Sequence, residues 1–104
     1  MTQERSTPDP QRLKMEAAAQ QFYLEQKSKG HHPQDILKMM IQHGFADYYR
    51  FHTLLNAEYM TVREAKAFKE ISEPWLEGRI AQAVYDKWKQ DAIAKDLRLK
   101  WFFK

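Results

Sequence analysis

Four histidines are the residues of this chain whose chemistry can be tested most directly against their spacing. His31 and His32 are adjacent, whereas His43 and His52 stand on separate segments. Zinc sites commonly place two histidines one helical turn apart around a glutamate, or combine histidine with cysteine, and neither pattern occurs here. The spacing therefore predicts no metal site and indicates histidines that are exposed or that cap helices.

Acid–base and nucleophilic chemistry have equally few candidates. His43 and Asp47 are four residues apart and would pair if one helix ran through Gly44, but an isolated pair of this kind is usually a surface contact. The sequence contains no cysteine, its three glycines are isolated, and no serine stands in a catalytic trio. We therefore expect a protein that is not an enzyme and that uses no cofactor.

Aromatic side chains are the stronger signal. Three Trp, five Tyr and six Phe in 104 residues are more than one narrow helical core easily holds. Aromatic residues and methionine are enriched at protein interfaces. An ordinary core is the alternative for the middle cluster, and a membrane-surface anchor is the alternative for the C-terminal one. The residues expected at a protein interface are Tyr48, Tyr49, Phe51, Leu55, Tyr59, Ile93, Leu97, Trp101 and Phe102.

Proline and glycine divide the chain into helices. Asp9 and Pro10 are a typical N-cap and first helical residue, and the helix that they open runs to about residue 28. Pro33 opens a second helix, which Gly44 ends in a left-handed conformation.

Residues 45–60 have partial strand propensity, but their apolar positions recur every three or four residues, which predicts a third helix. Thr61 and Glu64 then form the Ser/Thr-x-x-Glu signature of a capping box. This signature predicts a fourth helix over residues 62–71.

Ser72 followed by Pro74 repeats the start signal and predicts the longest helix, from about residue 73 toward the C-terminus. The apolar stripe of this helix shifts by one residue near position 90. The displaced part consists of Ile93, Leu97 and Trp101, so the helix would either kink there or serve two surfaces, one inside its own domain and one outside it.

These signals predict an all-α fold, a small bundle of four to five helices with a long C-terminal helix. Residues 1–9 are expected to be a disordered N-terminal tail and residues 10–104 a single α-helical domain. No apolar run approaches the roughly 20 residues that span a bilayer, so we expect no membrane contact and a cytoplasmic location. A two-fold homodimer is the commonest oligomer, and the displaced stripe would be its seam.

Nucleic-acid binding is the alternative function. The net charge of +3 is a weak positive field, but the segment 61–85 has the outline of a helix-turn-helix. Its expected turn, residues 70–73, lacks glycine, and its second helix opens with Glu73 and Glu77, which would repel phosphates. Protein binding is therefore favoured over a helix-turn-helix-like hairpin that binds nucleic acid.

In length, in helical make-up, in the aromatic-rich middle from Gln34 to Tyr59 and in the following helix from Trp75 to Ile93, the chain resembles the small quorum-sensing antiactivators of proteobacteria. The resemblance implies a cytoplasmic protein without cofactor that binds a LuxR-type acyl-homoserine-lactone receptor and stops it from activating transcription. It assigns no role to any single residue. We therefore expect a regulator that covers the dimerisation or DNA-binding surface of a transcriptional activator.

Overall fold

The computed structural model describes residues 9–104, and this part of the chain contains helices and no strand. The expected all-α bundle is confirmed. The tail expected over residues 1–9 lies outside the described residues, except for Asp9. The elements are α1 (Pro10–Ser28), α2 (Pro33–Gln42), α3 (Asp47–Ala57), α4 (Val62–Leu76), α5 (Gln82–Lys95) and the 3₁₀ helix η2 (Leu97–Trp101).

The start signals of the first, second and fourth helices have the expected geometry. The Asp9 side chain accepts a hydrogen bond from the Gln11 N–H at 3.0 Å. The imidazole of His32 accepts one from the Gln34 N–H at 3.1 Å, so His32 caps α2. Both hydrogen bonds of the Thr61–Glu64 capping box are present. In each of these helices a side chain therefore accepts a hydrogen bond from one of the N–H groups that the first turn leaves free.

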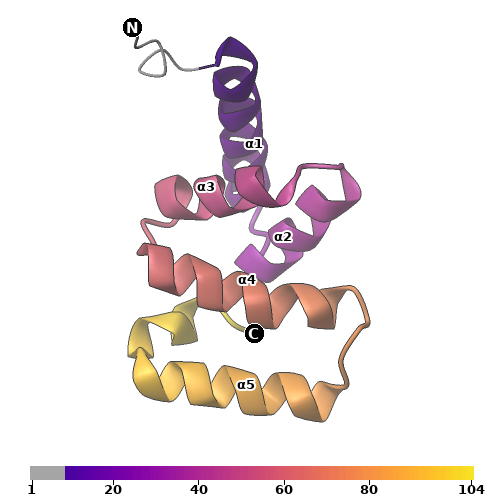
Figure 1. Ribbon diagram of the computed structural model, residues 1–104, viewed down its shortest axis with the longest axis vertical. Coiled ribbons are helices and arrows are strands. Elements are labelled where there is room, and N and C mark those ends of the chain that lie inside the picture. Colours follow the sequence, from indigo (N-terminus) through magenta and orange to yellow (C-terminus); the bar gives the residue numbers. More distant parts are fainter. Residues whose placement is uncertain (1–8) are drawn as a thin grey trace, which may run out of the picture.

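Helix α4 crosses the middle of the molecule (Figure 1). Helices α2 and α3 lie on one side of it, and α5 runs antiparallel to it on the other side. Helix α1 packs on α3 and α2 and extends away along the longest dimension, which is 51 Å. After α5 the chain folds back between α5 and α4, at the edge where α3 turns into α4.

The expected long C-terminal helix is wrong. Helix α4 continues through Ser72 and Pro74 to Leu76, so the turn expected at residues 70–73 is helical. The actual turn contains Gly78, with φ 73°, and the Pro74 carbonyl accepts the closing hydrogen bond from the Arg79 N–H. Pro74 lacks the N–H that would bond the Glu70 carbonyl, so it costs the last turn of α4 one helical hydrogen bond. Buried contacts of Ser72 and Glu73 outweigh that loss.

A second break separates α5 from η2. Asp96 is extended, with φ −151° and ψ 100°, and its side chain accepts a hydrogen bond from the Arg98 N–H at 3.0 Å. Aspartate is a strong N-cap residue, and here it ends one helix and starts the next. The stripe expected on one helix therefore belongs to two elements, Ile93 on α5 and Leu97 and Trp101 on η2.

The core gathers around Phe68 of α4. The rings of Phe102 and Phe103 lie 6.2 Å and 5.3 Å from it, and Phe103 also contacts the ring of Tyr85. Tyr85 is the one buried residue of α5. The segment after η2 therefore holds α5 on the body of the molecule.

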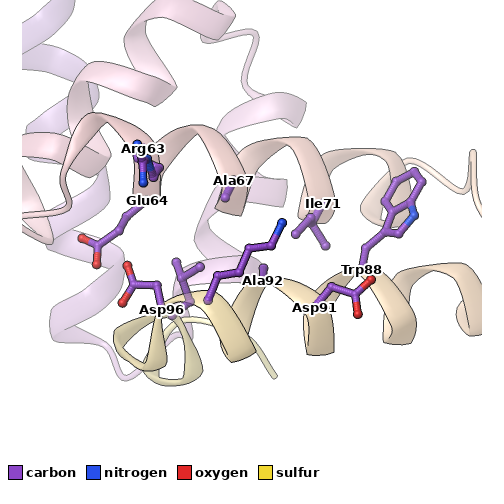
Figure 2. Close-up of a pocket in the computed structure, with 10 residues that line it drawn as sticks. Arg63, Glu64, Ala67, Ile71, Trp88, Asp91, Ala92 and Asp96 are labelled. Atoms are coloured by element: carbon purple, nitrogen blue, oxygen red, sulfur yellow. The ribbon is translucent and has the colours of Figure 1, made fainter.

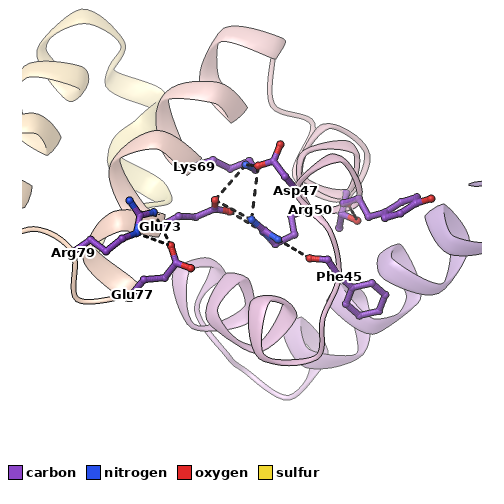
Figure 3. Close-up of polar contacts among 9 residues, drawn as sticks. Phe45, Asp47, Arg50, Lys69, Glu73, Glu77 and Arg79 are labelled. Atoms are coloured by element: carbon purple, nitrogen blue, oxygen red, sulfur yellow. Dashed lines mark hydrogen bonds and ion pairs between the residues drawn. The ribbon is translucent and has the colours of Figure 1, made fainter.

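An ion cluster joins α3 to α4 (Figure 3). Arg50 donates to both carboxylate oxygens of Glu73, at 2.8 Å and 3.1 Å, and to the carbonyl of Phe45. Lys69 pairs with Asp47 and with Glu73. The hydrogen bond from Lys69, more than its charge, lowers the pKa of Asp47. Glu73 is 9% exposed, so its charge needs both cations.

Gln34 forms the polar centre of the fold. Its amide nitrogen donates to the Ser72 hydroxyl at 3.0 Å and to the Tyr85 hydroxyl at 2.7 Å. Its amide oxygen accepts from the N–H of Lys104 at 3.0 Å. Gln34 and Ser72 are 0% exposed, and Tyr85 is 1% exposed. One side chain of α2 thus binds α4, α5 and the segment after η2.

Replacing Gln34 with alanine leaves buried hydroxyls and a backbone N–H without partners. We expect a loss of about 3 kcal/mol in the free energy of unfolding, since each such group costs about 1–3 kcal/mol. Gln42→Ala, at the exposed end of α2, is the control and should change stability by less than about 0.5 kcal/mol. Urea unfolding measures both variants, and equal losses would contradict the role given to Gln34.

The cap formed by His32 makes stability depend on pH. Burial, and then the charge of Lys104, lowers the pKa of His32, while Asp35 and Glu58 act in the opposite direction. The unfolded chain therefore binds a proton more readily, and stability should fall as the pH drops below about 6.5. We expect His32→Asn, which keeps a capping oxygen, to lose less stability than the parent between about pH 7.5 and about pH 5.5.

The matched control for this pH experiment is His31→Asn, because His31 is exposed and caps no helix. Urea unfolding of this variant should keep the parent's dependence on pH. The account of the His32 cap fails if both variants follow the parent.

Candidate protein-interaction surface

The turn between α3 and α4 is anchored on both sides of Tyr59. The carboxylate of Glu58 accepts hydrogen bonds from the Tyr23 hydroxyl at 2.6 Å and from Lys27 at 2.8 Å, both on α1. Burial, and then the Glu58 carboxylate, raises the pKa of Tyr23, which therefore stays a neutral donor. Met60, 4% exposed, belongs to the core. The backbone between Glu58 and Met60 consequently has little freedom.

Tyr59 adopts a left-handed backbone conformation, with φ 56°, and is the only non-glycine residue with positive φ in the described chain. This region costs an ordinary residue about 1–2 kcal/mol. Its side chain is 80% exposed, and its hydroxyl makes no hydrogen bond within residues 9–104. Strain that presents an exposed aromatic ring to solvent is typical of a functional site.

Arg98 connects η2 to this turn. Its Nε lies 3.3 Å from a carboxylate oxygen of Glu64, and its Nη2 donates to the Tyr59 carbonyl at 3.4 Å. The Glu64 side chain is only 4% exposed. Trp101 follows Arg98 by three residues and therefore shares a face of the 3₁₀ helix with it. The indole thus projects from the same side of η2 as the Arg98 side chain.

Four exposed apolar side chains stand on the segments that Arg98 joins. Their exposed fractions are 80% for Tyr59, 59% for Val62, 74% for Leu97 and 81% for Trp101. We call them the Tyr59–Trp101 patch. Single exposed apolar residues are common, but a group of large ones on fixed segments is typical of a binding surface.

The nine predicted interface residues occupy four environments. Tyr59, Leu97 and Trp101 belong to the patch. Tyr48, 44% exposed, lies beside α1, where its hydroxyl donates to Glu16, and this hydrogen bond raises the pKa of Tyr48. Phe102 is 8% exposed and packs on Phe68, so it is a core residue. The predicted residues that are partly buried against the core are Tyr49, Phe51, Leu55 and Ile93.

The seam expected for a homodimer is not one continuous helical stripe. Ile93 is partly buried against the core, whereas Leu97 and Trp101 are exposed on η2. The homodimer itself stays a prediction.

Sequence reasoning missed Val62 and Arg98. The capping box places Val62 at the first helical position, which could have indicated an exposed side chain. Nothing local indicates the role of Arg98, because its partners lie 34 and 39 positions earlier in the sequence.

The histidines do not gather into a reactive site. His43 lies against the ring of Phe22, with centroids 4.8 Å apart, while Asp47 pairs with Lys69. His43 and Asp47, whose spacing suggested a possible pair, therefore make contacts with other residues instead. Within residues 9–104, no group of three or more His, Cys, Asp or Glu residues is placed to hold a metal ion.

In comparisons with known proteins, no family model matches this chain, and neither a curated protein nor a solved structure shows significant similarity to it. Among the described helices, none has the length and apolar character that a membrane crossing needs.

Replacing Tyr59 with glycine tests whether this position is strained. Glycine adopts positive φ without a steric cost, so we expect Tyr59→Gly to be more stable than Tyr59→Ala by about 1 kcal/mol. The alanine variant removes the same ring but keeps the strain, which isolates the backbone effect. Urea unfolding measures the difference, and an alanine variant as stable as the glycine variant would contradict the assignment of strain.

Proposed function

We propose that this protein is a regulator that binds another protein through the Tyr59–Trp101 patch and inhibits it by covering a surface that it needs. One observation carries the proposal: Tyr59, Leu97 and Trp101 are 74–81% exposed on segments whose backbone is fixed. Buried aromatic anchors supply much of the energy of protein interfaces. In this proposal the chain acts by binding and catalyses no reaction.

The fixed backbone favours tight binding. Glu58 anchors the turn between α3 and α4, and Arg98 anchors η2. When a partner binds, side chains of the patch therefore lose conformational freedom, but the backbone loses little. Association then costs less conformational entropy than the ordering of a flexible loop would. The left-handed backbone of Tyr59 further fixes the direction in which its ring projects.

The proposed partner is a LuxR-type transcriptional activator, and the proposed location is the cytoplasm. Support comes from the resemblance of the chain to small quorum-sensing antiactivators. A partner whose own dimerisation surface is apolar would match the patch in chemistry, since both surfaces would lose water on contact.

The test is direct binding of a purified LuxR-type receptor to the full chain and to single alanine variants at Tyr59, Leu97 and Trp101. We expect at least one variant to lose about 2 kcal/mol or more of binding free energy. Leu13→Ala on α1 and Val84→Ala on α5 are matched controls, because both leucine and valine are exposed apolar residues outside the patch. These controls should bind like the parent.

Circular dichroism verifies that each variant keeps its helices. The proposal is wrong if the receptor does not bind, or if the patch variants and the controls bind equally. Salt-sensitive binding of nucleic acid that is insensitive to the patch variants would favour the alternative function instead.

A further inference from the structure

One side of α1 is packed and the other is open. Ala19 and Tyr23 are buried against the fold, whereas Leu13 and Leu24, on the outer side, are 47% and 45% exposed. The helix extends away from the body of the molecule, so this outer side is accessible along its length (Figure 1). We call it the α1 face, and it consists of Leu13, Lys14, Ala17, Gln20, Gln21, Leu24, Glu25 and Ser28.

The spacing along the α1 face is that of a seam between two helices. Leu13, Ala17, Gln20 and Leu24 follow one another at intervals of four, three and four positions. This repeat places their side chains in one stripe, which a second helix with the same repeat can pack against. With 19 residues, the helix offers a stripe about 28 Å long.

Two charges on the α1 face have no partner within residues 9–104. Of the five charged residues of α1, Arg12 pairs with Glu16 at 3.6 Å and Lys27 pairs with Glu58 at 2.8 Å. Lys14 and Glu25 are the remaining two, and they have opposite signs. Both are exposed, one toward each end of the face.

A groove of about 430 Å³ between α4 and α5 differs in this respect (Figure 2). Arg63 stands next to Glu64 in its lining, Lys95 stands next to Asp96, and Asp91 lies nearer to its other end. Cations and carboxylates are therefore mixed there, and the charge of that groove selects no occupant. On the α1 face the two charges are separated along the helix.

The α1 face is complementary to itself when its direction is reversed. Leu13 and Leu24 are eleven positions apart, about three helical turns, and so are Lys14 and Glu25. A two-fold axis at position 19, the middle of the helix, brings residues 13 and 14 of one copy beside residues 24 and 25 of the other. Each leucine then packs on a leucine, and each lysine meets a glutamate, twice in one dimer.

We propose that two copies of this chain associate through antiparallel contact of their α1 faces. The antiparallel direction places the two bodies at opposite ends of the helix pair, so they do not collide (Figure 1). A single helix face is smaller than a standard interface, which buries about 800 Å² on each partner, so we expect a dissociation constant in the micromolar range. The dimer is independent of the proposed function, since no residue of the Tyr59–Trp101 patch lies on α1.

Sedimentation equilibrium of the full chain between about 10 µM and about 1 mM measures the association. We expect a reversible dimer that Ala17→Lys and Leu24→Lys each weaken at least about tenfold, because each would bury an unpaired charge at the seam. The matched controls are Ala83→Lys and Val84→Lys, at exposed positions of α5, and they should associate like the parent. Circular dichroism verifies that every variant keeps its helices.

Exchange of charges tests the contact between Lys14 and Glu25. Lys14→Glu and Glu25→Lys each make these two positions alike in charge, so each variant alone should self-associate at least about threefold more weakly. An equimolar mixture of the two variants restores both contacts and should associate like the parent. Lys38→Glu and Glu70→Lys, at exposed positions of α2 and α4, make the same changes in net charge and should each behave like the parent.

Disulfide cross-linking tests the direction, because the sequence contains no cysteine of its own. A mixture of Leu13→Cys and Leu24→Cys should form a linked dimer on mild oxidation. Either variant alone should not, since identical positions lie about 15 Å or more apart along an antiparallel pair and a disulfide needs Cα atoms within about 7 Å.

Three results would overturn the inference. One is a mass of a single chain at all concentrations, which would leave the α1 face to another protein. The second is a dimer that Ala17→Lys and Leu24→Lys do not weaken, which would place the contact elsewhere, such as on η2. The third is efficient cross-linking of Leu13→Cys with itself, which would show a parallel pair.

Discussion

The hydrogen bonds of one buried amide hold the two halves of this fold together. Gln34, on α2, reaches Ser72 of α4, Tyr85 of α5 and the N–H of Lys104. Helix α5 fully buries only Tyr85, while its Ala92 and Ile93 pack partly buried against the core. The constraint is strict because a buried amide stabilises a fold only when its partners are all in place. Because Gln34 must keep its hydrogen bonds to Tyr85 and Lys104, α5 and the segment after η2 have to lie within reach of this amide.

The proposed binding surface depends on that placement. When Phe102 and Phe103 pack against Phe68, η2 is brought to the turn between α3 and α4, where Arg98 meets Glu64 and the Tyr59 carbonyl. The same packing brings Leu99 to the groove that lies between α4 and α5. Phe102 and Phe103 are thus core residues, whereas Trp101, next to them in sequence, stays exposed at the surface.

Local signals predicted most helix starts, because a cap is a contact between residues two or three positions apart. Asp9, Thr61 and Glu64 are examples. Ser72 and Pro74 misled the prediction because buried contacts with Gln34 and Arg50, distant in sequence, keep that segment helical. The sequence also indicated aromatic residues at an interface but could not separate Phe102 from Trp101. That distinction arises from how the segment after α5 folds back, which no local pattern encodes.

Site-specific photo-cross-linking in living cells tests the central claim most directly. A benzophenone amino acid would replace Trp101 in one version of the chain and Val84, an exposed residue on α5, in another. The account predicts that position 101 cross-links to a LuxR-type activator and that position 84 does not. Cross-linking of position 101 to nucleic acid, or equal cross-linking of both positions to the same protein, would contradict the assignment of the Tyr59–Trp101 patch as the binding surface.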